Sequence, residues 1–176
     1  DTLSLHDALP ISRQLYEVDA ALGIGANSQI ADVVAELLSD NTEHKEKIEE
    51  FPDKQLLCLE GRRIQSTPPY TAYLKIAEGC DKHCTYCIIP SLRGSYRSVP
   101  MERLVKEAEQ LAEQGVRELI LVAQETTLYG IDLYGEKSLH KLLDELNKIN
   151  GLFWIRIMYC YPEEIYEDLI DSMIRN

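Results

Sequence analysis

Residues 118–125 read Glu-Leu-Ile-Leu-Val-Ala-Gln-Glu, a short apolar run that two polar residues close. A run of this length and composition is typical of a strand that is buried inside a sheet. Further strands are predicted at 73–77 and 153–159, and amphipathic helices are predicted at 101–114, from about 138 to 150, and from 162 onward. Strand and helix thus alternate three times, which predicts an α/β fold with a parallel sheet and right-handed crossovers.

The alternation stops at Asn176 before a barrel could close. We therefore expect the first three β/α units of an incomplete TIM-like barrel over residues 71–176. Before it, a strand within 19–25 and a helix from Ile30 to Leu38 predict the remnant of a small α/β domain over residues 13–50. Residues 51–70 are expected to form a linker. The polar stretch 39–54, which overlaps the start of this linker, is predicted to be a boundary or linker, and 55–60 a possible strand.

Residues 1–12 have neither the basic start nor the small-residue cleavage site of a signal peptide. They resemble the in-frame translation of a sequencing-adapter oligonucleotide, and the alternative is a native amphipathic turn. We exclude them from the fold prediction. The native protein is expected to begin well before Arg13, so the chain is expected to be a fragment.

The composition limits the classes of partner. Lys and Arg number 18 against 30 Asp and Glu, a formal net charge of −12. Nucleic-acid-binding proteins typically have an excess of basic residues, whereas this chain has an excess of acidic ones, which favours a basic or a small partner. No apolar run approaches the roughly 18 residues that a membrane span needs. The five cysteines are odd in number, which argues against a disulfide framework and for a reducing compartment such as the cytoplasm.

Three of the cysteines crowd together. Cys80, Cys84 and Cys87 have the spacing C-x3-C-x2-C directly after the first predicted strand of the barrel. Three thiolates on one tight loop can bind three irons of a 4Fe–4S cluster and leave the fourth iron open to a small molecule. The alternative is a zinc-stabilised binding module with His83 as fourth ligand. Zinc sites usually use two separated cysteine pairs, and the sequence has no second pair, so the cluster is favoured.

The stretch from Ile76 to Gly94, with Tyr86 before the last cysteine, resembles the radical S-adenosylmethionine (SAM) enzymes. More specifically it resembles the methylthiotransferases, and this resemblance runs from about Arg13 to Asn176. It implies that the open iron binds SAM. It also implies that the cluster, reduced by an electron donor, passes an electron to SAM and splits it into methionine and a 5′-deoxyadenosyl radical. The radical then removes a substrate hydrogen. It also implies a second 4Fe–4S cluster on three cysteines upstream of this chain, so the fragment alone is expected to be inactive.

Three stretches of the sequence distinguish between two subfamilies of the methylthiotransferases. Residues 89–94, 124–127 and 159–162 resemble the enzymes that modify the β-carbon of an aspartate in ribosomal protein S12. They differ from the corresponding stretches of the enzymes that modify an adenosine of tRNA, which are the alternative. The acidic charge agrees with S12 as partner, because opposite charges steer the encounter with a basic ribosomal protein. Val99 departs from the arginine that the family commonly has there.

The resemblance also implies site residues. Tyr86 would lie near the adenine of SAM, and Gln124 and Glu125 near its methionine end, on the rim where a β/α barrel gathers its chemistry. Gln124 could instead merely cap a strand end. The cofactors carry the chemistry, so we assign no catalytic side chain. Cys160, on the same rim, is expected to pack, and Cys58 to be inert.

Arg156 has two interpretations. Side-chain alternation places it on one face of its strand together with Trp154 and Met158. A guanidinium there could form an internal ion pair, with Glu78 or Glu125 as candidate partners. It could instead bind a carboxylate of SAM or of the substrate aspartate through two hydrogen bonds. We favour the ion pair but keep Arg156 as a candidate cofactor-binding residue.

Overall fold

The computed structural model describes residues 14–39, 47–52 and 64–176. The chain divides into two compact units. One contains residues 1–62 and 81–95, and the other contains residues 63–80 and 96–176. Cys80 therefore closes one segment of the larger unit, whereas Cys84 and Cys87 belong to the smaller unit. Each unit is described by itself.

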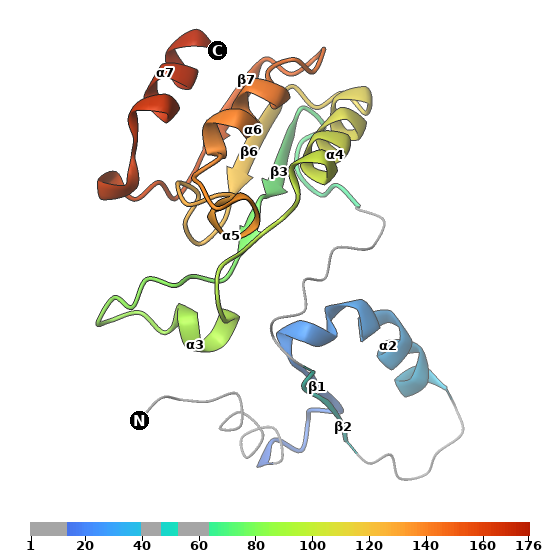
Figure 1. Cartoon of the computed structure of the whole chain (residues 1–176). Coiled ribbons are helices and arrows are strands. Elements are labelled where there is room, and N and C mark those ends of the chain that lie inside the picture. Colours follow the sequence, from blue (N-terminus) through green and yellow to red (C-terminus); the bar gives the residue numbers. More distant parts are fainter. Residues whose placement is uncertain (1–13, 40–46, 53–63) are drawn as a thin grey trace. The chain divides into compact units, whose positions relative to one another are not determined.

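The larger unit is built on a parallel sheet of three strands in the order β3-β6-β7 (Figure 1). Its strands are β3 (Thr71–Lys75), β6 (Glu118–Val122) and β7 (Trp154–Ile157). Its main helices are α4 (Met101–Glu113), α6 (Leu139–Leu146) and α7 (Glu167–Arg175). The predicted parallel sheet with alternating strands and helices is confirmed.

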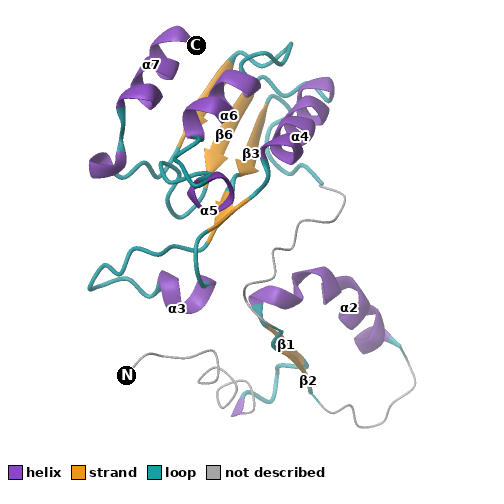
Figure 2. Cartoon of the chain, in the orientation of Figure 1, coloured by secondary structure: helices purple, strands orange, loops and turns teal. Residues whose placement is uncertain are grey.

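The sheet has one covered and one open face. Helices α4 and α6 lie over one face, as the purple ribbons over the orange strands show (Figure 2). Leu74 and Leu121 are paired across β3 and β6 and are fully buried. On the alternate positions, Tyr73 and Trp154 are 48 % and 64 % exposed. Period-two alternation thus sends the apolar set to the helices and leaves aromatic side chains on the other face.

The larger unit also contains two short strands and a short helix that were not predicted from the sequence. The chain passes from β3 into β4 (Ala77–Glu78), which pairs antiparallel with β5 (Arg97–Ser98). A four-residue helix, α5 (Ile131–Tyr134), lies in the connection between β6 and α6. These elements are too short to show a period in the sequence.

The predicted helix from Pro162 onward is wrong in its first part. A 3₁₀ turn, η3, covers Pro162–Glu164, and α7 begins only at Glu167. Between them the backbone of Ile165 and Tyr166 is extended. The helix restarts where Glu167 and Asp168 place negative charge in its first turn, which the helix dipole favours.

The smaller unit contains two parallel strands, β1 (Ala20–Leu22) and β2 (Ile48–Glu50). The 3₁₀ helix η2 (Ile24–Gln29) leads into α2 (Ile30–Leu38), and α3 covers Ile89–Arg93. The predicted helix from Ile30 to Leu38 is confirmed. Strand β2 lies inside the polar stretch that we expected to be a boundary, so that expectation is wrong there. The strand suggested for 55–60 and Cys58 lie outside the described residues.

No described helix has the length and apolar character that crossing a membrane would require.

Candidate site at the carboxyl edge of the sheet

The three strands of the parallel sheet end at one edge, and three polar segments follow them there. We call residues 78–80, 124–127 and 158–161 the carboxyl edge. The Gln124 amide donates to Glu78 Oε1 at 3.0 Å, and the Thr126 N–H donates to the Tyr159 carbonyl at 3.2 Å. These bonds join the segments after β3 and β7 to the segment after β6. The structure therefore brings the three segments together, as the β/α alternation predicts.

Glu78 is the acceptor at the centre of the edge. It is 4 % exposed, and its carboxylate accepts hydrogen bonds from Lys75 Nζ, Gln124 Nε2 and the Gly79 N–H. An ionised carboxylate only accepts hydrogen bonds, so it fixes the Gln124 amide with its nitrogen toward Glu78 and its oxygen away. Gln124 thus bonds a side chain of the neighbouring segment of the edge.

The Gln124 carbonyl oxygen is left without a partner. Gln124 Oε1 is buried and accepts no hydrogen bond within the described chain. A buried acceptor without a donor costs on the order of 1–3 kcal/mol. An N–H or O–H group of a ligand would remove that cost. This orphaned oxygen is the observation by which the carboxyl edge fits a cofactor that carries a donor group.

Glu125 and Thr126 are used within the protein. Glu125 is 3 % exposed, and its Oε1 accepts from the Thr127 N–H at 3.1 Å, from the Thr127 hydroxyl and from the Tyr161 N–H at 3.4 Å. The hydroxyl of the fully buried Thr126 donates to the Met158 carbonyl at 2.7 Å. Together they tie the segment after β7 to the segment after β6.

Tyr159 has an unusual backbone in this segment. Its φ is 60°, and it is the one non-glycine residue with a positive φ in the part of the chain that the structure describes. Such a conformation costs roughly 1 kcal/mol or more and persists when its surroundings hold it. The Thr126 N–H, which donates to the Tyr159 carbonyl, supplies that support. Its neighbour Cys160 lies with Sγ 3.4 Å from Thr126 Oγ1, in keeping with a packing role.

The cysteines are described in two places. Cys80 is 8 % exposed and follows Gly79, whose φ of 81° favours glycine. Cys84 and Cys87 form a turn in which the Cys87 N–H donates to the Cys84 carbonyl at 3.0 Å, and Tyr86 on this turn is 91 % exposed. No disulfide joins any of the four cysteines within the described residues. Three thiols with the spacing C-x3-C-x2-C suit an iron–sulfur cluster chemically.

The described ranges contain no group of three or more His, Cys, Asp or Glu side chains arranged to hold a metal ion. Joint ligation by Cys80, Cys84 and Cys87 therefore stays a prediction. The same holds for a zinc site that includes His83.

Arg156 forms an ion pair, but with a partner other than those suggested. Its Nε and Nη2 donate to Glu118 Oε1 at 3.0 and 2.5 Å, and its guanidinium lies 5.4 Å from the centre of the Trp154 ring. The hydrogen bond from Arg156 lowers the pKa of the Glu118 carboxyl. The register explains the pairing, because Arg156 lies opposite Ile120 and Glu118 is two residues earlier on the same face.

This ion pair lies toward the amino end of β6, away from the carboxyl edge. Glu78 is instead bonded to Lys75 and Gln124, and Glu125 to Thr127. The Arg156 side chain is 48 % exposed, so water screens the pair and its contribution to stability is small.

One residue near the carboxyl edge, Tyr96, was not predicted from the sequence. Tyr96 is 4 % exposed, and its hydroxyl donates to the Glu125 carbonyl at 2.8 Å. Burial, helped by the charges of Asp132 and Glu125, raises the pKa of Tyr96 far above its ordinary value, so it stays a donor. Val99 is 4 % exposed, which explains why an apolar residue is accommodated there. The partner of Tyr96 lies 29 residues away in the sequence, so no local pattern signalled this contact.

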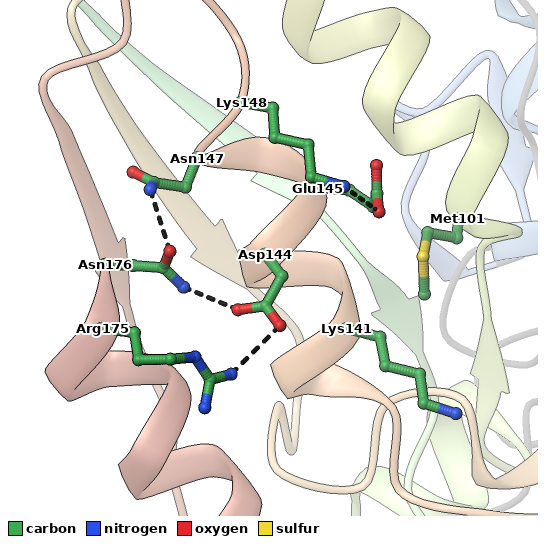
Figure 3. A pocket seen from close by; sticks show the side chains of 8 residues that line it. All are labelled: Met101, Lys141, Asp144, Glu145, Asn147, Lys148, Arg175 and Asn176. Atoms are coloured by element: carbon green, nitrogen blue, oxygen red, sulfur yellow. Dashed lines mark hydrogen bonds and ion pairs between the residues drawn. The ribbon is translucent and has the colours of Figure 1, made fainter.

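A hollow elsewhere in the larger unit is less suited to a ligand (Figure 3). Four of its charged side chains already bind other residues of the lining. Asp144 accepts from Arg175 at 3.2 Å and from Asn176 at 2.7 Å, and Lys148 pairs with Glu145 at 2.6 Å. The lining residues are Met101, Lys141, Asp144, Glu145, Asn147, Lys148, Arg175 and Asn176.

A parallel sheet with polar segments gathered at its carboxyl edge, followed after β4 by three closely spaced cysteines, defines the class. The model of the radical SAM superfamily matches residues 74–176, and the chain belongs to that superfamily. The chain is 55 % identical over 164 residues to the ribosomal protein uS12 methylthiotransferase RimO of Lachnoclostridium phytofermentans, covering 93 % of this chain and 36 % of the relative. It is 51 % identical over 160 residues to the protein of the same name from Clostridium perfringens strain SM101, covering 91 % and 35 %.

The chain thus spans about a third of the length of these curated relatives. Among solved structures it is similar to the radical SAM methyltransferase TsrM from Kitasatospora setae, with cobalamin and a 4Fe–4S cluster bound. The identity is 21 %, the TM-score is 0.48, and the match covers 64 % of this chain and 22 % of that one.

Proposed function

We propose that this chain is part of a radical SAM methylthiotransferase that adds a methylthio group to the β-carbon of an aspartate in ribosomal protein uS12. The observation that carries the proposal is the 55 % identity to a RimO protein over 93 % of the chain. The net charge of −12 suits a basic ribosomal protein as substrate. The reaction needs an electron donor and a reducing compartment, for which we propose the cytoplasm.

In this proposal the larger unit is the first part of a β/α barrel, and residues 13–50 are the remnant of the domain that precedes it. The second 4Fe–4S cluster belongs to the region before this chain. Cys80, Cys84 and Cys87 hold the first cluster, which, when bound, supplies the electron that cleaves SAM. The protein's task is then to place SAM and the substrate and to exclude water.

Gln124 is the side chain best prepared to bind SAM. Glu78 turns its carbonyl oxygen away from the carboxylate, so Oε1 presents an acceptor to a donor group at the methionine end of SAM. Glu125 acts through its hydrogen bonds to Thr127 and Tyr161, which fix the two segments that border this place. Both residues follow β6, at the edge where a parallel sheet gathers its ligands.

Two further residues complete the proposed SAM site. Tyr86, which is 91 % exposed, offers an aromatic face to the adenine. Arg156 points to the sheet face opposite the helices, the inner face of a closed barrel. It would have to exchange Glu118 for a carboxylate of SAM or of the substrate.

Anaerobic reconstitution with iron and sulfide tests the cofactor. A broad brown absorbance is expected for the wild-type chain, strongly reduced in Cys84→Ala and retained in Cys160→Ala, the matched control. Tight zinc binding without a cluster would instead support a zinc-stabilised module. For the substrate, the complete protein is incubated with SAM, a reductant and either uS12 or tRNA. The mass of an added methylthio group is expected on uS12 alone, and its appearance on tRNA would overturn the assignment.

A further inference from the structure

The segment that carries Cys84 and Cys87 leaves the larger unit and returns to it at two adjacent strands. It departs after β4 through Gly79 and Cys80, and it returns through Tyr96 into β5. Strands β4 and β5 are paired antiparallel, and the Val99 N–H donates to the Ile76 carbonyl at 2.8 Å. The two ends of the cysteine-bearing segment are therefore held side by side.

The returning strand has a second partner, which is a carboxylate. The Ser98 N–H donates to Asp132 Oδ2 at 2.8 Å, and the Ser98 hydroxyl donates to Asp132 Oδ1 at 2.6 Å. The same hydroxyl accepts from the Gly130 N–H at 2.9 Å. Asp132 thus takes the place of a further strand on the outer side of β5. Hydrogen bonds to an ionised acceptor are roughly twice as strong as neutral ones.

The connection that supplies Asp132 is itself tightly fixed. Gly130 has a φ of 88°, and a Cβ added there would lie 2.7 Å from Ser138 Cβ, so only glycine fits. The Tyr129 hydroxyl donates to the Val99 carbonyl at 2.8 Å, and the Met101 N–H donates to the Tyr134 hydroxyl at 3.0 Å. Residues 129–134 therefore clamp the chain from Ser98 to Met101 at several points.

We propose that Asp132 is a positioning residue for the iron–sulfur cluster. By fixing Ser98, it sets where the cysteine-bearing segment returns to the sheet, and it thereby reduces the conformations that Cys80, Cys84 and Cys87 must lose when they bind iron. Holding both ends of a segment before its ligand binds lowers the entropy cost of binding. The inference rests on the proposed cluster, but Asp132 belongs to no ligand set assigned above.

The test compares Asp132→Ala, Asp132→Asn and wild type in the complete protein after anaerobic reconstitution. The rate at which a ferrous chelator removes iron is followed by the loss of visible absorbance. We expect Asp132→Ala to lose iron on the order of tenfold faster than wild type, because a segment whose returning end is loose loses more conformational freedom when its cysteines bind iron. Asp132→Asn keeps one acceptor for Ser98, so its rate should lie between the two.

Asp144→Ala is the matched control. Asp144 also accepts several hydrogen bonds in the larger unit, from Ser172 at 2.7 Å and Asn176 at 2.7 Å, but it joins α6 to α7. It should lower the melting temperature as much as Asp132→Ala while leaving the rate of iron loss unchanged. Equal acceleration by both variants, or a wild-type rate in Asp132→Ala, would overturn the proposal.

A second measurement tests the positioning role of Asp132 separately from the proposed cluster. In the apoprotein, trypsin cleavage after Lys82 and Arg93 reports on the order of the segment without any cluster. We expect faster cleavage in Asp132→Ala and in Ser98→Ala, and not in Asp144→Ala. If wild type binds no cluster, the proposed function fails. Unchanged cleavage in Asp132→Ala and Ser98→Ala would then overturn this inference as well.

Discussion

The Glu78 carboxylate accepts a hydrogen bond from the Gln124 amide at 3.0 Å, and this bond joins the ends of two neighbouring segments of the carboxyl edge. Because Glu78 can only accept, the orientation of the Gln124 amide is decided by chemistry. The unpartnered Gln124 Oε1 follows from that orientation. Glu78, which is only 4 % exposed, thus orients Gln124 so that its uncharged carbonyl oxygen is left as a hydrogen-bond acceptor.

Glu78→Gln should weaken SAM binding. The new amide can offer its own nitrogen to Gln124, so the Gln124 amide can turn over and its oxygen no longer faces the proposed SAM site. We expect the Kd for SAM, measured by titration calorimetry on the reconstituted protein, to rise about tenfold, equivalent to ~1.4 kcal/mol. The visible spectrum of the cluster should not change.

The control for this change is Glu164→Gln, which removes a partly buried carboxylate bonded to Lys137 at 2.7 Å. It should leave the Kd for SAM at the wild-type value. An unchanged Kd in Glu78→Gln would show that the orientation of Gln124 is irrelevant to SAM.

Thr126→Val should destabilise the protein without a change in volume. The Thr126 hydroxyl is buried and donates to the Met158 carbonyl at 2.7 Å, which valine would leave without that donor. The expected loss in the free energy of unfolding is about 1–3 kcal/mol, measured by urea denaturation. Thr71→Val removes the partly buried hydroxyl bond to Glu118 at 3.2 Å and should cost less than 1 kcal/mol, roughly the net value of an ordinary hydrogen bond. If both variants lost the same free energy of unfolding, burial of the Thr126 hydroxyl would not explain its contribution.

The Arg156–Glu118 pair predicts a pH dependence. Arg156 lowers the pKa of Glu118 below its ordinary value of 4.5. A carboxyl whose pKa is lowered in the folded protein stabilises it above the unfolded pKa, and this contribution disappears as the pH falls through the folded pKa. The melting temperature of wild type should therefore exceed that of Glu118→Gln by a small margin at pH 7. The margin should vanish as the pH falls below 4.5. A margin independent of pH would contradict the ion pair.

The sequence predicted those parts of the fold in which many residues repeat one pattern. The apolar run at 119–121 and the amphipathic stripe of α4 could hardly form anything other than a buried strand and a covering helix. Strand β5 has two residues, Arg97 and Ser98, and its existence depends on β4 and Asp132, which lie far away in the sequence. The strand propensity of these two residues contains no information about partners that are distant in the sequence.

The candidate site was predictable to the same extent. That Gln124 and Glu125 follow a strand of a parallel sheet places them at its carboxyl edge, and the structure agrees. Which carboxylate meets which donor depends on register. The pairing of Ile120 with Arg156 brings Glu118 within reach of the guanidinium, whereas the local chain brings Glu78 to Lys75. A change of one residue in the register of β6 and β7 would have turned Arg156 to the other face of the sheet, away from Glu118.

Gly130→Ala tests how rigid the connection after β6 must be. Gly130 and Gly135 both have a positive φ, 88° and 74°, so alanine is strained at either position. They differ in space, because a Cβ at Gly130 would lie 2.7 Å from Ser138 Cβ and 2.9 Å from Tyr134 Cδ2, whereas nothing lies within 4 Å at Gly135. Gly135→Ala should therefore cost about 1 kcal/mol and Gly130→Ala at least about 2–3 kcal/mol in the free energy of unfolding.

The two glycine variants should also differ at the cluster. The Gly130 N–H donates to the Ser98 hydroxyl, while nearby Tyr129 bonds Val99 and Asp132 bonds Ser98. A shift of this backbone must therefore move the end of the cysteine-bearing segment, whereas strain at Gly135 is relieved in an open turn. Iron loss to a chelator should accelerate in Gly130→Ala and stay at the wild-type rate in Gly135→Ala. Acceleration in proportion to the loss of stability in both variants would mean that the cluster senses only the global stability of the fold.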